Sequence, residues 1–267
     1  MGSRAHNFLI HRINQRIAEE LPYRGRVIDL GCGLAPYKQL ILRSAKSYVG
    51  VDWPKSFHGN PNTDVYASLR DHLPFQPACA DTVVSFQVME HLPDPNTLLG
   101  EAHRILRPGG ALFLTIPFMW LVHEAPYDYC RYTRHGLQHL LEKHGFVEIE
   151  IRENTGFWQM WSLKFNYHTQ RPHSPLKYLL LPVWVLSQIV TPWMDRFDRH
   201  PEETASYTVL ARTRCQGPAR GGIAVRDSVV RDQRCEERAG DDPLAGQVDV
   251  PVRIPVEGIP GVTERRT

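Results

Sequence analysis

Apolar residues recur every three or four positions near the start of the chain, and this spacing predicts a helix over residues 5–21. From residue 26 onward, short apolar runs alternate with helical patterns. The expected strands are 26–30, 47–52, 64–68, 81–87, 111–117 and 146–153, and the expected helices are 36–44, 96–106 and 134–144. Alternation of this kind is typical of a parallel sheet with helices on both faces.

A turn within this alternation and two later regions that break it complete the pattern. The sequence RPGG at 107–110 predicts a turn before a strand. Residues 176–194 are densely apolar, and residues 206–213 predict one more strand. We therefore expect one α/β domain over 1–213, with an apolar helical insert or cap over 156–205.

Residues 214–267 mix Gly, Pro, Arg, Asp and Val without helical or strand periodicity. This segment has too little apolar bulk to offset the entropy of ordering, so we expect a largely disordered tail. A small β element built on VDVPVRIPV is the alternative.

The composition fits a globular domain of 267 residues, because 42% of them are hydrophobic. The balance of 31 basic and 29 acidic residues gives no argument for a nucleic-acid partner. Five cysteines, none spaced as CxxC, favour free thiols in a reducing compartment over a disulfide framework or a zinc site, and we expect no metal. The first residues lack an apolar signal-peptide core, so the expected location is cytoplasmic.

A glycine turn follows the first expected strand in VIDLGCGLAPY, residues 27–37. Asp29 lies at the strand end, and Gly31 and Gly33 permit a tight turn that a ligand can approach closely. A dinucleotide site would show G-x-G-x-x-G, but the third glycine is missing here. Asp29 would repel phosphates and suits a positively charged ligand better.

Two further acids follow the next strands. Asp52, nineteen residues after Gly33, ends the second strand, where an acid can accept hydrogen bonds from both ribose hydroxyls. Asp71 follows the third strand, where it could accept from an adenine amino group. A solvated loop carboxylate is the alternative for Asp71. All three acids are expected at the carboxyl ends of consecutive strands, where open α/β sheets bind ligands.

In this order, VIDLGCG, GVD, RDHLPF, DTVVSFQVMEHLPD and AHRILRPGGALFLTIP resemble the motifs of class I S-adenosylmethionine-dependent methyltransferases of the type 11 group, over roughly residues 20–213. The resemblance implies a Rossmann-like, seven-stranded, mostly parallel sheet whose last strand is antiparallel. The implied cofactor is S-adenosyl-L-methionine. The cofactor-binding residues that it implies are Asp29, Gly31, Cys32 and Gly33 at the glycine turn, Asp52 at the ribose, Asp71 near the adenine and Gln87 beside the sulfonium. Ala35 stands where this family often has a third glycine, and we expect an ordinary backbone angle there.

In this fold the loop after the fifth strand faces the transferred methyl group, and HEAPYDYCRYT (123–133) occupies that position. The candidate bases are His123, Glu124 and Asp128. Three tyrosines, Tyr127, Tyr129 and Tyr132, could line the acceptor pocket, and Arg131 could bind a carboxylate or phosphate on the acceptor.

The alternative for HEAPYDYCRYT is a purely structural loop, in which Thr133 caps the next helix and Asp128 pairs with Arg131. The HE-P-D-Y-RYT spacing resembles bacterial methyltransferases often linked to surface glycan or lipid-linked assembly.

The apolar run YLLLPVWVLSQIVTPW (178–193) is shorter than the roughly 20 residues that a membrane-spanning helix needs. Basic residues flank it and Trp184 and Trp193 lie inside it, a combination that suits a segment at a membrane surface. One hypothesis is a lid for a lipid-linked acceptor with peripheral membrane contact. The alternative is a helical cap or dimer face packed on the sheet.

The function expected from these features is methyl transfer to a small-molecule or lipid- or glycan-linked acceptor, with oxygen as the methylated atom. C-methylation of a quinone precursor and a non-catalytic cofactor-binding regulator remain alternatives. A nucleotide-dependent oxidoreductase is disfavoured by the missing glycine. A nucleic-acid methyltransferase is disfavoured because QVMEH (87–91) stands where Asn-Pro-Pro-Tyr or Asp-Pro-Pro-Tyr would be expected.

Overall fold

The computed structural model describes residues 7–54, 62–171, 175–198 and 200–215. Its strands are β1 (Arg26–Leu30), β2 (Ser47–Asp52), β3 (Val65–Tyr66), β4 (Ala80–Phe86), β5 (Leu106–Pro117), β6 (Val147–Glu153) and β7 (Ser206–Arg212). Its α-helices are α1 (Phe8–Glu20), α2 (Lys38–Ile41), α3 (Pro95–Ile105), α4 (Arg134–Lys143), α5 (Phe157–Gln170) and α6 (Leu181–Phe197). The described residues also form the 3₁₀-helices η2 (Met89–His91), η3 (Pro175–Leu180) and η4 (Pro201–Glu203).

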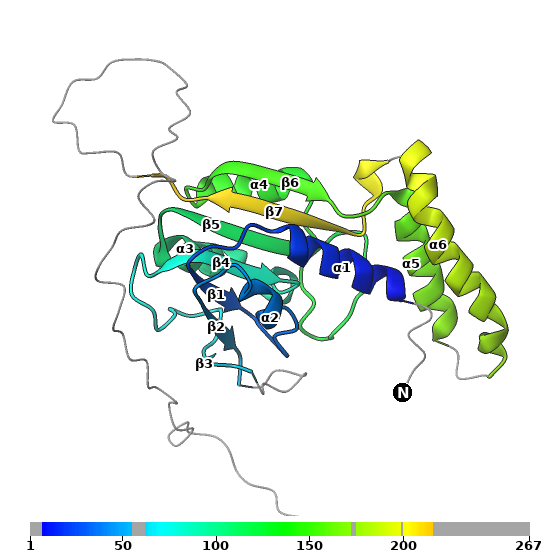
Figure 1. The fold of residues 1–267 in the computed structure, drawn as a ribbon, viewed down its shortest axis with the longest axis horizontal. Coiled ribbons are helices and arrows are strands. Elements are labelled where there is room, and N and C mark those ends of the chain that lie inside the picture. Colours follow the sequence, from blue (N-terminus) through cyan, green and yellow to red (C-terminus); the bar gives the residue numbers. More distant parts are fainter. Residues whose placement is uncertain (1–6, 55–61, 172–174, 199, 216–267) are drawn as a thin grey trace, which may run out of the picture.

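The seven strands form one sheet in the order β3-β2-β1-β4-β5-β7-β6. The first five pair in parallel, and β7 lies antiparallel between β5 and β6 (Figure 1). This arrangement confirms the expected fold class, including residues 206–212 as the antiparallel last strand. Chain order changes direction between β1 and β4, which is where open α/β sheets place their ligands.

Alternating residues of the central strands feed two hydrophobic clusters, one on each face of the sheet. Ile28, Val83 and Leu112 belong to the cluster that includes buried residues of α3 and α4. Val27, Val84 and Phe113, which are adjacent to them in sequence, belong to the other cluster, together with buried residues of α1, α2 and α5. The continuous apolar runs of β1 and β4 are therefore explained by burial on both faces.

Three elements, β3, α2 and β5, depart from the sequence prediction by more than shifts at their ends. β3 has only two residues because its partner strand ends at Asp52, so the ladder has nothing further to pair with. The helix expected over 36–44 is α-helical only in α2 and continues as turns to Ala45. Residues 107–110 lie within β5 rather than before it, and they form an irregularity there, because Leu106 pairs with Ala80 and Ala111 with Thr82.

The apolar insert forms a hairpin of α5 and α6, which Figure 1 shows beyond one end of the sheet and beside α1. Trp184, expected at a surface, is buried against α5, and its indole N–H donates to Thr169 Oγ1 at 2.9 Å. The helical period explains this correction, because it places Trp184 on the inner face and leaves Trp193 outside. Among the described residues, no helix combines the length and apolar character needed to cross a membrane.

The tail predictions fall on residues 216–267, which lie outside the described residues. The cysteine prediction is partly corrected. Cys32, Cys79 and Cys130 are free, whereas Cys215 is disulfide-bonded. An odd number of cysteines without CxxC spacing excludes complete pairing but does not exclude one pair.

Candidate functional site

The glycine turn after β1 is held against the end of β2. The backbone N–H groups of Gly31 and Cys32 both donate to the carbonyl of Val51, at 2.8 and 3.0 Å. Gly31 has a φ of +83°, and a Cβ there would lie 2.5 Å from the Val88 side chain. Gly33 has a φ of +51°, but a Cβ on it would meet no atom within 4 Å. The turn therefore requires glycine at Gly31 for packing and leaves open space beside Gly33.

The prediction of an ordinary backbone angle at Ala35 is wrong. Ala35 has a φ of +50°, in the left-handed region that glycine tolerates best. Its N–H donates to the Cys32 carbonyl at 2.7 Å, which closes the turn and imposes this angle. The methyl group is buried, so alanine adds packing at a position where a glycine would relieve backbone strain.

Asp29 and Asp52 are both buried, but their surroundings differ. One Asp29 oxygen accepts from the Tyr48 hydroxyl at 2.7 Å, and the other has no hydrogen-bond partner. Burial raises the pKa of Asp29 to about 7. Asp52 accepts from the backbone N–H groups of Gly33 and Trp53, at 2.8 and 2.6 Å. Asp52 thus fixes the turn, while Asp29 keeps one oxygen for a ligand.

A cavity of about 550 Å³ opens at the carboxyl ends of the central strands. Of the predicted cofactor residues, its lining includes Asp29, Gly31, Cys32, Gly33, Asp52 and Gln87. Asp71 is exposed and does not line the cavity, whereas the preceding residues Ser68, Leu69 and Arg70 do. Burial raises the pKa of the Cys32 thiol to about 12, so the thiol lines the cavity as a neutral group. The volume suits one nucleoside-sized ligand.

The Asp128 carboxylate is engaged within the HEAPYDYCRYT loop. It accepts from both terminal nitrogens of Arg131, at 2.5 and 2.7 Å, and from the His123 backbone N–H at 2.9 Å. The Arg131 hydrogen bonds hold the pKa of Asp128 down at about 2. Arg131 also donates to the carbonyls of Leu121 and Cys130. This ion pair therefore holds the loop in its conformation, as expected if the loop is structural.

The other residues of the loop divide between the cavity and the protein interior. Glu124 and Tyr127 line the cavity, and the Tyr127 ring packs edge-on against Trp53 at 5.8 Å between centroids. Tyr129 is exposed, and Tyr132 packs against the core with a buried hydroxyl. Of the three predicted pocket tyrosines, only Tyr127 lines the cavity. Thr133 caps α4 by accepting from Gly136 N–H at 3.1 Å.

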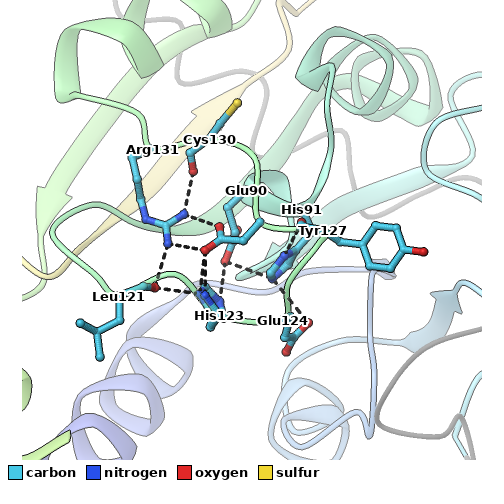
Figure 2. A network of polar contacts seen from close by, with 9 residues as sticks. Glu90, His91, Leu121, His123, Glu124, Tyr127, Cys130 and Arg131 are labelled. Atoms are coloured by element: carbon cyan, nitrogen blue, oxygen red, sulfur yellow. Dashed lines mark hydrogen bonds and ion pairs between the residues drawn. The ribbon is translucent and has the colours of Figure 1, made fainter. Parts of the chain in front are cut away.

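Sequence reasoning missed Glu90 and His91, which lie in η2 just after β4. Figure 2 shows both side chains facing His123, which belongs to the loop after β5. Glu90 is fully buried, and burial raises the pKa of its carboxyl group to about 8. The sequence shows the EH pair in QVMEH and the HE pair in HEAPYDYCRYT. It does not show that they meet, because His91 and His123 are 32 positions apart and their contact depends on the pairing of β4 with β5.

The sheet order, the antiparallel β7 and a glycine turn opening into a cavity define the class I methyltransferase fold. The sequence from residue 1 to 151 matches a family model described as a methyltransferase domain. Because this match covers more than half of the 267 residues, the chain belongs to that family of methyltransferase domains, and the expected class I relationship is confirmed.

Individual relatives match over shorter segments. A protein of Mycolicibacterium smegmatis, described as a "Probable S-adenosylmethionine-dependent methyltransferase", is 33% identical over 110 residues, which cover 39% of this chain and 42% of that protein. A Proteus mirabilis protein, "Ubiquinone biosynthesis O-methyltransferase", is 27% identical over 123 residues, covering 40% of this chain and 50% of that protein. The match thus spans half or less of these relatives' length.

Two solved structures share the fold. A Thermotoga maritima structure, described as an S-adenosylmethionine-dependent methyltransferase and possible histamine N-methyltransferase, superposes with a TM-score of 0.51 at 18% identity. That match covers 79% of this chain and 92% of the other. Phosphoethanolamine N-methyltransferase 2 of Haemonchus contortus, in complex with S-adenosyl-L-methionine, gives a TM-score of 0.50 at 16% identity, covering 79% of this chain and 56% of the other. At these identities the likeness establishes the fold.

The residues present fit S-adenosyl-L-methionine. The unpartnered Asp29 oxygen supplies a buried negative group for a cationic ligand, and the open space beside Gly33 lets a ligand approach the backbone. Asp52 lines the same cavity at the end of β2, the position suited to a ribose.

Proposed function

We propose that the protein is an S-adenosylmethionine-dependent methyltransferase that methylates oxygen on a small-molecule or lipid- or glycan-linked acceptor. One observation carries the proposal: Asp29, the glycine turn and Asp52 line the same cavity as Glu124 and Tyr127. The residues proposed for the cofactor and those proposed for the acceptor therefore share one cavity. When bound, the cofactor supplies a methyl group on a positively charged sulfur.

The roles proposed for the cofactor residues follow their positions in the cavity. Asp29 and the turn Gly31–Gly33 hold the methionine end, and Asp52 binds the ribose hydroxyls. Gln87 has a φ of +57° and its N–H donates to the Thr115 carbonyl at 2.8 Å, so its backbone is fixed where β4 ends. Asp71, which lies outside the cavity lining, is the weakest of the cofactor assignments, and Leu69 and Arg70 are better placed beside an adenine.

Among the three candidate bases, Glu124 is the best placed to accept a proton from an acceptor hydroxyl. It lines the cavity, and its side chain is 33% exposed. The Asp128 carboxylate is already occupied by Arg131, and the His123 ring faces Glu90 rather than lining the cavity. A base must come within hydrogen-bond reach of the proton that it removes, which favours Glu124.

Glu124→Gln tests this assignment. We expect turnover to fall about 100-fold or more, the range of general-base catalysis, while the affinity for S-adenosyl-L-methionine changes little. Turnover is measured as transfer of labelled methyl groups into a bacterial lipid extract and into a water-soluble extract. Unchanged turnover in Glu124→Gln would contradict the assignment, and label in carbon-bound methyl groups would favour the quinone alternative. Cofactor binding without transfer into either extract would favour the regulator.

The outer surface of the insert supports a lipid-linked acceptor. Large apolar side chains are exposed along η3 and α6: Leu176, Leu179, Leu186, Ile189, Trp193 and Phe197. Those on α6 recur every three or four positions and therefore share one face of the helix, and Lys177 and Arg196 supply positive charge near the two ends of this band. We propose peripheral contact between this band and an anionic membrane surface on the cytoplasmic side.

Flotation with anionic vesicles tests the membrane contact. We expect the protein to float with the vesicles and Trp193→Glu to float much less, because a charge replaces an exposed aromatic anchor. Arg152→Glu, on β6, serves as a control for a charge change elsewhere. If the unmodified protein stays at the bottom of the gradient, the membrane proposal is wrong and a soluble acceptor is favoured.

A further inference from the structure

Three side chains converge at the end of η2, beside the proposed acceptor site. Glu90 Oε1 lies 3.7 Å from His91 Nε2 and 3.9 Å from His123 Nε2. One ligand atom from each of Glu90, His91 and His123 lies within 4.8 Å of the others. Two ligand atoms bound to one tetrahedral ion at about 2.1 Å are about 3.4 Å apart. The two Glu90 distances exceed this value by a few tenths of an ångström, so small side-chain rotations, the largest of them about 1 Å, would bring the set to metal-binding distances.

The second nitrogen of each imidazole has a hydrogen-bond partner. His91 Nδ1 lies 3.0 Å from the Tyr127 carbonyl, which accepts only if Nδ1 carries the proton. His123 Nδ1 lies 3.2 Å from the Leu121 carbonyl and 3.3 Å from Asp128 Oδ2. These acceptors assign the proton of each ring to Nδ1 and leave the Nε2 lone pairs directed at the Glu90 carboxylate. Metal-binding histidines are oriented by this kind of contact.

The Glu90 carboxylate is the second observation that points to a ligand. It is fully buried, and neither of its oxygens has a hydrogen-bond partner. The dashed lines that join Glu90 to His91 and His123 in Figure 2 mark ion-pair contacts of 3.7 and 3.9 Å. A buried carboxylate without hydrogen bonds is costly, and a bound cation removes that cost. If the cluster were only a structural hydrogen-bonded network, Glu90 would be expected to accept at ordinary hydrogen-bond distances, and it does not.

We propose that Glu90, His91 and His123 bind one divalent transition-metal ion of the kind that imidazole and carboxylate ligands favour, such as Zn²⁺, Mn²⁺ or Co²⁺. Glu124 Oε2 lies 3.7 Å from His91 Nε2, on the side where Glu124 and His91 line the cavity. The three-ligand set leaves a coordination position for an oxygen of the acceptor. The Asp128–Arg131 pair then serves the site by fixing His123.

The role in the reaction rests on the proposed methyltransferase function. An acceptor hydroxyl on the ion would have a lowered pKa and would lose its proton to Glu124. Its oxygen would then form the bond to the methyl carbon, and the electron pair of the broken carbon–sulfur bond would stay on sulfur. A metal site would also place the acceptor oxygen reproducibly against the cofactor.

The test measures binding of Zn²⁺, Mn²⁺ and Co²⁺ alone to the full chain after treatment with a chelator. We expect one ion per chain, with a visible Co²⁺ spectrum from nitrogen and oxygen ligands. Glu90→Gln and His123→Ala should each weaken binding of the preferred ion about 100-fold or more, a loss expected to exceed the 10–100-fold typical of supporting residues. His139→Ala, an exposed histidine on α4, is the matched control and should bind normally.

A thermal unfolding series covers the case in which a variant folds poorly. The preferred ion should raise the midpoint of the unmodified protein and of His139→Ala, but not that of Glu90→Gln, because only a ligand that binds the native state stabilises it. Absence of stoichiometric binding, or equal binding by Glu90→Gln, overturns the proposal. Titration of metal-free protein with S-adenosyl-L-methionine distinguishes failure of the metal site from failure of the methyltransferase function. Cofactor binding without metal binding would contradict only the metal site. Metal binding without cofactor binding would contradict the methyltransferase function.

Discussion

The role of each polar side chain at this site depends on the hydrogen-bond partners and charges that surround it. Asp29 and Asp52 were recognisable from the sequence because each follows a buried strand at a defined distance from the glycine turn. The roles of Asp128 and Arg131 could not be assigned from the sequence alone, because their spacing allows both an ion pair and a pocket. Glu90 was missed because its buried environment is created by a loop more than 30 residues away.

Asp29 predicts a pH dependence of cofactor affinity. Its pKa in the free protein is raised to about 7, so below that pH it is mostly neutral, whereas a cationic ligand needs the ionised form. Affinity for S-adenosyl-L-methionine should therefore rise with pH up to about 7 and level off above it, changing up to about tenfold per pH unit on the acid side. Calorimetric titration between pH 5.5 and 8.5 measures this.

Asp29→Asn is the control for that titration. The variant should bind more weakly at pH 8 and lose most of the pH dependence, because asparagine does not titrate. The raised pKa also means that the folded state binds the Asp29 proton more tightly than the unfolded chain. The stability it contributes is present at acid pH and is lost as the pH rises through about 7. An unchanged pH profile in Asp29→Asn would show that another group is responsible.

The Asp128–Arg131 pair predicts a stability effect. The Asp128 side chain is 1% exposed, so Arg131→Ala leaves a buried carboxylate without its counter-charge. We expect the free energy of unfolding to fall by about 3 kcal/mol, measured by urea denaturation. Arg152→Ala removes the exposed Arg152–Glu150 pair as a control and should cost less than about 1 kcal/mol. A normal stability with weaker acceptor binding would instead support the role in acceptor binding expected from the sequence.

At the scale of elements, hydrophobic periodicity was sufficient for the sheet and for most helices. The antiparallel direction of the last strand was implied by the resemblance to class I methyltransferases, and the strand order is known from the structure alone. The apolar run at 176–194 was harder to interpret, because periodicity locates an apolar face without saying what covers it. In the structure the inner side of α6 packs against α5, and the outer side stays exposed.

Asp195 joins the two helices of the insert. This buried residue of α6 accepts from the backbone N–H groups of Gly156, Trp158 and Gln159, at 3.1, 2.9 and 3.2 Å, and so caps α5 from another helix. Asp195→Ala leaves these donors without a partner and should destabilise the insert by about 3 kcal/mol. Hydrogen exchange should show faster exchange in α5 and α6, with β1 and β4 still protected.

Asp198→Ala is the matched control for Asp195→Ala. Asp198 is near the end of the same helix, but its contact with the Trp158 indole N–H at 2.9 Å is on the surface. Its loss should leave amide exchange in α5 nearly unchanged. Equal exchange in Asp195→Ala and the unmodified protein would mean that the hairpin is held by its apolar contacts alone.

At the scale of the whole molecule, the cavity is bounded by parts of the chain that are far apart in sequence. The lining comes from α1, the turn after β1, the end of β2, the segment after β3, the end of β4 with η2, and the loop after β5. Sequence spacing predicted that Asp29 and Asp52 would lie close together, because each ends one of two consecutive strands, and both line this cavity. The lining by Glu124 and Tyr127 depends on how a long loop folds, and only the structure separates these two residues from their inward-facing neighbours.

The most direct test of the account is calorimetric titration of the purified protein with S-adenosyl-L-methionine, S-adenosylhomocysteine and NAD. We expect micromolar binding of the first two, no binding of NAD, and a loss of about 2–4 kcal/mol in Asp52→Ala from its hydrogen bonds to the ribose. That loss corresponds to roughly 30- to 1,000-fold in affinity. Failure to bind either sulfur-containing ligand, or an unchanged affinity in Asp52→Ala, would contradict the assignment of this cavity as the cofactor site.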